Sequence, residues 1–176
     1  WAALLLLLPY TPMLFMGQEF AASSRFYYFA DHRPDLGRLI TEGRRRDSAR
    51  LAGFDDERQQ REIPDPQAEE TFLASKLNLG ERHEGIGQQT WLLYHEMLGL
   101  RRSDAVLARQ DRQRIRAHVA GDLLLVHLWH RREHRLVAAN FGVGVDAAPE
   151  ALGAPAALLQ PRWCAVLSTD ERRFGG

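Results

Sequence analysis

The chain opens on a pattern of apolar positions that is typical of an α/β fold. Residues 1–8 are apolar on every side, which favours a buried helix, and Pro9 ends the run. Residues 12–16, PMLFM, then form a short apolar run between a proline and Gly17. This pattern predicts a strand buried on both faces, as in a parallel sheet covered by helices.

A second helix is predicted over residues 88–102, where apolar side chains recur at spacings of three and four and two arginines close the segment. Residues 38–50 are rich in charge and predict a solvent-facing helix that breaks near Gly43. Residues 55–70 are charged and then punctuated by proline, so we expect a surface crossing there.

Beyond residue 112 the apolar period changes from helical to alternating, which indicates antiparallel strands. Gly121-Asp122 and RREH at 131–134 are predicted turns, and RWCAVLST at 162–169 is predicted as a further strand. The sequence therefore predicts a tail of an α/β domain over residues 1–104 and a small antiparallel β-sandwich over residues 105–176.

Composition excludes several classes of protein. Among 176 residues, 23 basic and 23 acidic side chains cancel, so no net field attracts nucleic acid or an anionic membrane. Cys164 is the one cysteine, which excludes an intrachain disulfide and indicates a reducing, cytoplasmic compartment. We expect its side chain to be a small buried hydrophobe. The apolar opening is too short to span a bilayer and lacks the features of a signal peptide, which indicates the interior of a longer protein.

The histidines of the β region do not predict a metal site. His118, His127, His130 and His134 fall on different strands and turns without a supporting pair of carboxylates, so we expect ordinary surface or rim histidines. The arginine run at 44–46 is interpreted as a solvated helix face, with anion binding as the alternative.

Four polar residues are candidates for binding substrate. Gln18 and Glu19 follow the predicted buried strand directly, and ligands bind at the carboxyl ends of parallel strands. Glu19 could accept hydrogen bonds from sugar hydroxyls or could instead support other side chains. Asp31 and His32 lie on the long loop that follows and could reach the mouth of such a site. The aromatic run at 26–29 could stack on a sugar or pack locally.

Several segments, in order along the chain, resemble a known family: LLLLLPYTPMLFMGQEF, FADHRPDLG, TEGRRRD, PDPQ and TFLASKLNL. They are similar to the closing part of the malto-oligosyltrehalose trehalohydrolases, in the α-amylase superfamily (glycoside hydrolase family 13). WLLYHEMLGLRR, LVAANFG and LSTDERRFGG resemble that family's last helix and C-terminal β domain. The MGQE strand is shared across the superfamily, whereas FADH, EGRRRD and PDPQ followed by SKL indicate the trehalose-releasing branch.

The resemblance implies the end of a (β/α)₈ barrel followed by a sandwich, and a retaining mechanism with two carboxylates. It places the nucleophile, the acid/base and a third aspartate on strands before Trp1, so no residue of this chain is expected to be catalytic. It implies no metal or organic cofactor. The expected substrate is maltooligosyl trehalose or a related α-glucan, and the chain alone is expected to be inactive.

Two alternatives stay open. The first is a fragment of a glycogen branching or debranching enzyme, which would have a similar last strand and sandwich. The second is a β-sandwich without catalysis that stabilises a larger enzyme or binds carbohydrate; the strand LLLVHLW, apolar on both faces, indicates core rather than a sugar-binding row for that sandwich.

Overall fold

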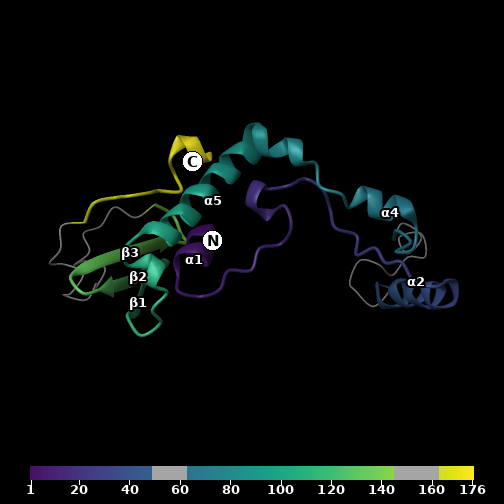
Figure 1. Cartoon of the computed structure of the whole chain (residues 1–176), viewed down its shortest axis with the longest axis horizontal. Helices are drawn as coiled ribbons and strands as arrows, with labels where there is room; N and C mark the ends of the chain where they lie inside the picture. Colours follow the sequence, from purple (N-terminus) through teal and green to yellow (C-terminus); the bar gives the residue numbers. More distant parts are fainter. Residues whose placement is uncertain (49–62, 145–162) are drawn as a thin grey trace. The chain divides into compact units, whose positions relative to one another are not determined.

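The computed structural model describes residues 1–48, 63–144 and 163–176 (Figure 1). These residues form two compact units. We call Trp1–Ala21 together with Glu81–Gly176 the sheet unit, and Ala22–Gly80 the inserted unit. The domain boundary predicted near residue 105 stays a prediction, and each unit is described by itself.

The first helix of the sheet unit, α1, spans Ala2–Leu7 and confirms the predicted buried helix. Leu6 is completely buried, and Leu7 is buried beside it. The chain leaves the helix at Leu8 in an extended conformation, immediately before Pro9. Proline lacks the amide proton that another turn would need, which explains why the helix ends here.

The predicted strand at residues 12–16 is absent from the structure. Residues 11–15 carry no regular secondary structure, and the side chain of Met13 is 85% exposed. A buried parallel strand exists only through hydrogen bonds to neighbouring strands. The described residues supply no such neighbour, so the prediction of a buried strand is wrong for this chain.

The long helix α5, Gly85–Ser103, confirms the predicted amphipathic helix and begins a few residues earlier than predicted. Its Tyr94 and Met97 are buried in one cluster with Leu6 and Leu7 of α1. Near its start Gly87 lies directly against the backbone, where a Cβ atom would overlap the carbonyl oxygen of Glu81. The absence of a side chain at this position therefore lets α5 lie close to the preceding segment.

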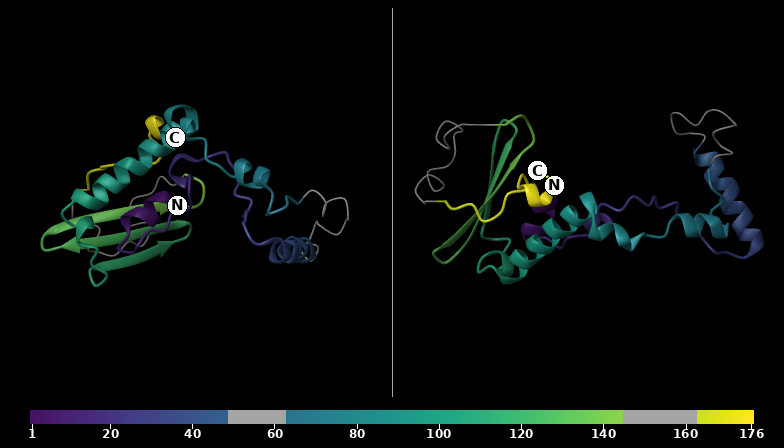
Figure 2. Two further views of the ribbon diagram at one scale, coloured as in Figure 1. Left: turned by 45° about the vertical axis from the view of Figure 1, so that its right-hand side comes forward. Right: turned by 90° about the horizontal axis from the view of Figure 1, so that it is seen from above.

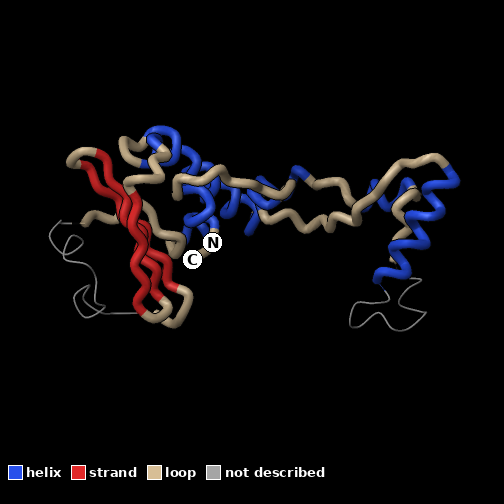
Figure 3. Tube along the Cα trace, turned by 90° about the horizontal axis from the view of Figure 1, so that it is seen from below, coloured by secondary structure: helices blue, strands red, loops and turns tan. Residues whose placement is uncertain are grey.

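Three antiparallel strands follow α5 and the short 3₁₀ helix η3 (Leu107–Arg109): β1 (Ile115–Ala120), β2 (Leu123–His130) and β3 (Glu133–Asn140). The sheet order is β1-β2-β3, so sequential strands pair through hairpins (Figure 3). Both hairpins turn at the predicted places, and Arg131 in the second has a positive φ of 55°. The second turn is shorter than RREH, because Glu133 and His134 already pair with β2.

The two faces of the sheet have different surroundings. Val126, Leu128 and Val137 point to one face and join the apolar cluster of α1 and α5, and both helices lie over this face in Figure 2. Leu125 and His127 alternate with them on the opposite face and are also buried. Strand β2 is therefore the buried centre of the sheet, as its apolar sequence predicts.

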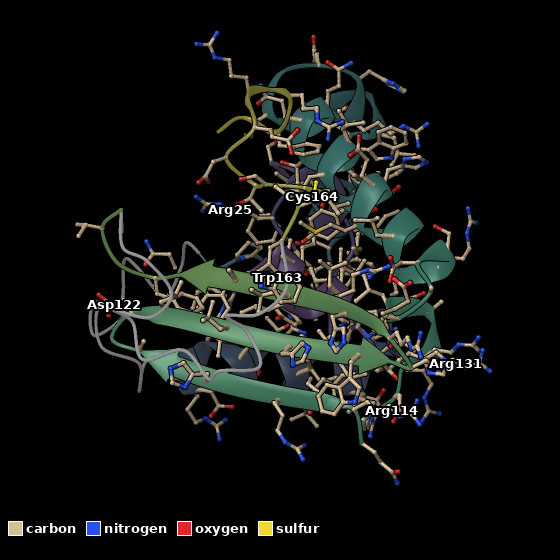
Figure 4. The ribbon with its side chains drawn as sticks, turned by 90° about the vertical axis from the view of Figure 1, so that its left-hand side faces the viewer. Arg25, Arg114, Asp122, Arg131, Trp163 and Cys164 are labelled. Carbon is tan, nitrogen blue, oxygen red and sulfur yellow. The ribbon has the colours of Figure 1, made fainter. Side chains whose placement is uncertain are left out.

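The last predicted strand of the sandwich does not appear in the part of it that the structure describes, residues 163–169. Residues 163–168 have no strand structure, and Cys164 is exposed rather than buried; Figure 4 shows it beside Trp163 on the C-terminal segment. Among the described residues no strand pairs with this segment, so the predicted burial of Cys164 is wrong. The chain then forms the 3₁₀ helix η4, Arg172–Phe174, where Phe174 is buried and Arg173 pairs with Glu96 of α5 at 2.6 Å.

The inserted unit contains α2, Pro34–Ser48, and α4, Glu69–Ala74. Helix α2 continues through Gly43, so the predicted break is wrong; glycine lowers helix propensity by only about 1 kcal/mol, which the rest of the helix tolerates. Residues 49–62, which include the first half of the predicted surface crossing, lie outside the described residues. The remaining 3₁₀ helices are η1, Gln18–Phe20, and η2, Leu79–His83. Within the described residues no helix is long and apolar enough to cross a membrane.

Candidate functional site

Gln18 and Glu19 form the start of η1 in the sheet unit. Gly17 precedes them with a φ of 82°, a conformation that favours glycine and turns the chain sharply. The side chain of Gln18 is fixed at both ends: its Oε1 accepts from the Phe15 amide at 3.2 Å, and its Nε2 donates to the Tyr94 hydroxyl at 3.0 Å. The structure therefore gives Gln18 a role in holding the turn.

Glu19 is half-buried beside Phe20, whose side chain is fully buried. The carbonyl oxygen of Phe20 faces Gly87 at the start of α5, so the turn packs directly against this helix. The carboxylate of Glu19 thus stands on a turn held by a buried aromatic ring, a glycine contact and the Tyr94 hydrogen bond. Such support holds a side chain in place for binding.

Asp31 and His32 lie on a loop of the inserted unit that is fastened to residues 66–67. The amide of Ala30 donates to the Pro66 carbonyl at 2.8 Å, and the amide of His32 donates to Oε1 of Gln67 at 2.8 Å. Asp31 and His32 both line an open cavity of about 500 Å³. This volume lies within the range of small-molecule sites in proteins.

The opposite wall of the cavity comes from α2, and Asp65 joins it to the loop. Oδ1 of Asp65 accepts from the Thr41 hydroxyl at 2.8 Å and from the Gln67 amide at 2.9 Å. The Gln67 amide, then the Thr41 hydroxyl, lower the pKa of Asp65 against the opposing effect of burial, and Arg45 lowers it further. The other residues that line the cavity from α2 are polar or small: Pro34, Gly37, Arg38 and Glu42.

Sequence reasoning missed Asp65, Gln67 and Arg45 as parts of this cavity. The segment PDPQ carried a signal, because an aspartate before a proline-containing turn commonly accepts backbone amides. Arg45 belongs to the arginine run at 44–46, which was interpreted as a solvated helix face with anion binding as the alternative. Neither the PDPQ segment nor the arginine run shows that its side chains line a common cavity, since the cavity depends on the contact between residues 65–67 and α2.

The aromatic run of the inserted unit packs locally. The Phe26 ring meets Phe29 edge-on at 5.6 Å between centroids, and Phe29 meets Phe72 of α4 at 5.0 Å. Arg44 donates to the Tyr27 carbonyl at 3.2 Å, which gives this arginine a structural contact within the unit. Tyr28 is 64% exposed. Local packing is therefore the interpretation that the structure favours for Phe26 and Phe29.

One histidine of the β region differs from its prediction. His127 is only 9% exposed, so a surface position is wrong for it. Its Nε2 lies 2.9 Å from Nδ1 of His134 on β3, and burial, with the nearby His134, lowers the pKa of His127. Among the described residues no group of three histidine, cysteine or acidic side chains could hold a metal ion.

The four predicted site residues thus belong to two places. Gln18 and Glu19 are adjacent on η1 of the sheet unit, whereas Asp31 and His32 are adjacent at the cavity of the inserted unit. The second place lies at the open cavity of about 500 Å³ described above. The cavity is therefore the better-defined candidate for ligand binding.

Comparison with solved structures defines the class of protein. A crystal structure of a protein assigned as an α-amylase, from Salmonella typhimurium, matches with a TM-score of 0.65 and 31% sequence identity. The match covers 84% of this chain and 25% of that one. No family model matches the chain. The fold and sequence together are those of part of an α-amylase-like enzyme.

The curated relatives narrow the class further. A malto-oligosyltrehalose trehalohydrolase from Deinococcus radiodurans is 43% identical over 145 residues, which are 82% of this chain and 24% of the relative. Enzymes of the same name from Rhizobium sp. and Mycobacterium tuberculosis are 42% and 40% identical, each over 61% of the chain and 17% or 18% of their own lengths. This chain is a relative of the malto-oligosyltrehalose trehalohydrolases, which are glycoside hydrolases, and it spans at most about a quarter of their length.

Proposed function

We propose that this chain is part of a glycoside hydrolase that cleaves the α-1,4 bond next to the trehalose end of maltooligosyl trehalose and releases trehalose. The observation that carries the proposal is the 43% identity over 145 residues to the Deinococcus radiodurans trehalohydrolase. Relatives from several organisms bear the same name. These names favour trehalose release over a branching or debranching reaction.

The chemistry of the proposed reaction needs residues beyond this chain. A retaining glycosidase places two carboxyl groups about 5 to 5.5 Å apart across one glycosidic bond. We propose that both of these groups lie outside this chain, and no aspartate or glutamate here is assigned to catalysis. The chain alone is accordingly proposed to be inactive.

The exposed apolar side chains at residues 12–16 support the proposal that this chain is part of a larger barrel. Met13, Phe15 and Met16 all have exposed side chains, although their sequence is that of a buried strand. We propose that these residues become the closing strand of a (β/α)₈ barrel when the other strands are present. Glu19 would then stand at the carboxyl end of that strand, where barrel enzymes bind substrate.

Four residues are proposed to serve substrate binding in the whole enzyme, three by contact and Gln18 by positioning Glu19. Glu19 offers a carboxylate to sugar hydroxyls, and Gln18 holds its turn through Tyr94. Asp31 and His32 supply a carboxylate and an imidazole at the cavity of the inserted unit. Both pairs provide the hydrogen-bonding groups that an α-glucan requires.

A chimeric enzyme tests the proposal. The segment of the Deinococcus radiodurans relative that aligns with this chain is exchanged for the chain, and the product is incubated with maltooligosyl trehalose and separately with amylose. We expect trehalose from the first substrate and no α-1,6 linkages from the second. A chimera that folds but releases no trehalose would count against the proposal, and trehalose released by the chain alone would show that it holds its own catalytic groups.

A further inference from the structure

Gln67 of the inserted unit carries a buried hydrogen-bond donor that no described residue satisfies. Its Nε2 has no hydrogen-bond partner among the described residues. Its Oε1 accepts from the His32 amide at 2.8 Å, and a backbone amide can only donate, so the two ends of the side-chain amide are not interchangeable. Buried donors are nearly always paired in folded proteins, so the unpaired Nε2 requires an explanation.

The fold reserves space for this side chain. A Cβ atom at Gly37 would lie 2.8 Å from Oε1 and 2.9 Å from Cδ of Gln67. Gly43, six residues further along the same helix, has nothing within 4 Å of such an atom. The glycine at position 37 therefore has a steric role that the glycine at position 43 lacks.

The cavity beside Gln67 has the character of a site for an uncharged polar ligand. The carboxylates of Asp31, Glu42 and Asp65 line it together with the guanidinium groups of Arg38 and Arg45. Nε of Arg38 lies 3.9 Å from Oε1 of Glu42, and the positive charge of Arg45 lowers the pKa of Asp65. Since the opposite charges nearly balance, an ion gains little from the field of the cavity, whereas a hydroxyl group can donate to carboxylates and accept from the cations.

We propose that the cavity of the inserted unit binds a glucose ring and that Gln67 is one of its sugar-binding residues. Oxygen atoms of the sugar accept from Nε2 of Gln67 and donate to the carboxylates of Asp31 and Asp65. The terminal torsion of glutamine is soft, so the amide can rotate toward a ligand oxygen from its buried position. The choice of glucose rests on the proposed function, whereas the cavity and the unpaired amide do not.

Nuclear magnetic resonance of the whole chain tests the site directly. Maltose, trehalose and sodium sulfate are titrated separately while the side-chain amide of Gln67 and the backbone amide of His32 are followed. We expect saturable shifts of both signals with maltose or trehalose, and the tighter sugar shows whether the ring comes from the α-1,4 chain or from the trehalose end. Shifts with sulfate alone, or no shift with either sugar, would overturn the proposal.

Two pairs of variants separate binding from folding. Gln67→Glu keeps an oxygen for the His32 amide but replaces the donor with an acceptor, and should weaken sugar binding about tenfold. Gln88→Glu makes the same change at an exposed position of α5 and should leave binding unchanged. Gly37→Ala displaces the Gln67 side chain and should weaken binding, whereas Gly43→Ala on the same helix should not. Equal binding by the two alanine variants, each with intact helix content, would contradict the proposal.

The chimeric enzyme distinguishes the failure of this proposal from the failure of the proposed function. A chimera that releases trehalose while neither sugar shifts Gln67 would retain the hydrolase and overturn the sugar site. Sugar-dependent shifts in a chain whose folded chimera releases no trehalose would support the sugar site and overturn the trehalohydrolase.

Discussion

The side-chain amide of Gln18 donates to the hydroxyl of Tyr94 at 3.0 Å, across 76 positions of the sequence. Tyr94 lies on α5 and is nearly completely buried. The bond therefore links the turn that carries Glu19 to the apolar core of the sheet unit. If Glu19 contacts substrate, this link holds its turn in the position that binding needs.

Tyr94→Phe removes this link while keeping the buried ring. Since the Gln18 side chain is exposed and can bind water instead, we expect stability to fall by only about 1 kcal/mol. In the chimeric enzyme kcat/KM for trehalose release should fall about three- to tenfold, because the Glu19 turn loses its hydrogen bond. Tyr10→Phe removes a hydroxyl from an exposed tyrosine of the same unit and is the matched control. Unchanged kinetics in Tyr94→Phe would remove the positioning role.

Arg101 of α5 fastens the end of α1 and the segment after it. Its guanidinium donates to the carbonyl oxygens of Leu6, Leu8 and Tyr10 at 2.7 to 2.8 Å. A lysine ammonium cannot span three such acceptors with the same planar geometry. Arg101→Lys should therefore lower the free energy of unfolding by about 2 kcal/mol in urea denaturation. Arg102→Lys, at the exposed neighbouring position, should change it little, and equal effects of the two variants would show that the clamp is unimportant.

Asp104 connects the end of α5 to β3. It accepts from the amides of Val106 and Leu107 at 2.9 and 3.0 Å and pairs with Arg135 at 2.7 Å. Burial alone would raise the pKa of Asp104, but these two amides and Arg135 lower it below its ordinary value. Asp104→Asn should therefore destabilise the chain by about 2 kcal/mol at pH 7.

The pH dependence of this destabilisation gives a second test. A lowered pKa means that Asp104 stabilises the fold above the unfolded value of about 3.9 and that this stabilisation is lost as the pH falls through the lower folded value. The unfolding free energies of the parent and of Asp104→Asn should thus converge in acid. A difference that stays constant down to the lowest accessible pH would assign the effect to packing rather than to charge.

His127 also loses stability as the pH falls, but at a higher pH than Asp104 does. Because burial lowers its pKa, the unfolded chain takes up a proton near pH 6.5 before the folded chain does. Stability should therefore be complete above about pH 7 and fall as the pH drops below about 6.5, until the lower folded pKa is passed. Thermal unfolding of the parent and of His127→Gln between pH 7.5 and 5.5 measures this, and parallel curves for the two proteins would contradict it.

Two further polar side chains lie near His127. His134 faces it from β3 at hydrogen-bond distance, and Arg116 of β1 is its register partner. The Arg116 guanidinium lies over the ring of Trp129, 5.7 Å from its centroid. Of these two neighbours, His134 adds to the effect of burial and lowers the pKa of His127 further.

Local patterns predict those parts of the fold that local interactions determine. The helices α1 and α5 and the hairpins of β1, β2 and β3 follow from apolar spacing, Pro9 and the turn at Gly121-Asp122. Segments whose structure depends on a partner were predicted wrongly. Residues 12–16 have the apolar sequence of a buried strand, but no described strand lies beside them. Cys164 is exposed because no described strand pairs with its segment either.

The candidate site shows the same division. Asp31 and His32 were identified from the sequence, but their cavity depends on the contacts of Asp65 and Gln67 with α2, which no local pattern contains. The tie between Gln18 and Tyr94 likewise joins residues far apart in the chain. Such pairings arise only when distant segments pack together, so the sequence indicates candidate residues without their partners.

Trehalose release by the chimeric enzyme tests the central claim most directly. The Deinococcus radiodurans relative, with its aligned segment replaced by this chain, is mixed with maltooligosyl trehalose, and free trehalose is measured over time against the chain alone. We expect the chimera to release trehalose steadily and the chain alone to release none above a blank. A correctly folded chimera that binds maltooligosyl trehalose but releases no trehalose would contradict the assignment of this chain to a trehalose-releasing hydrolase.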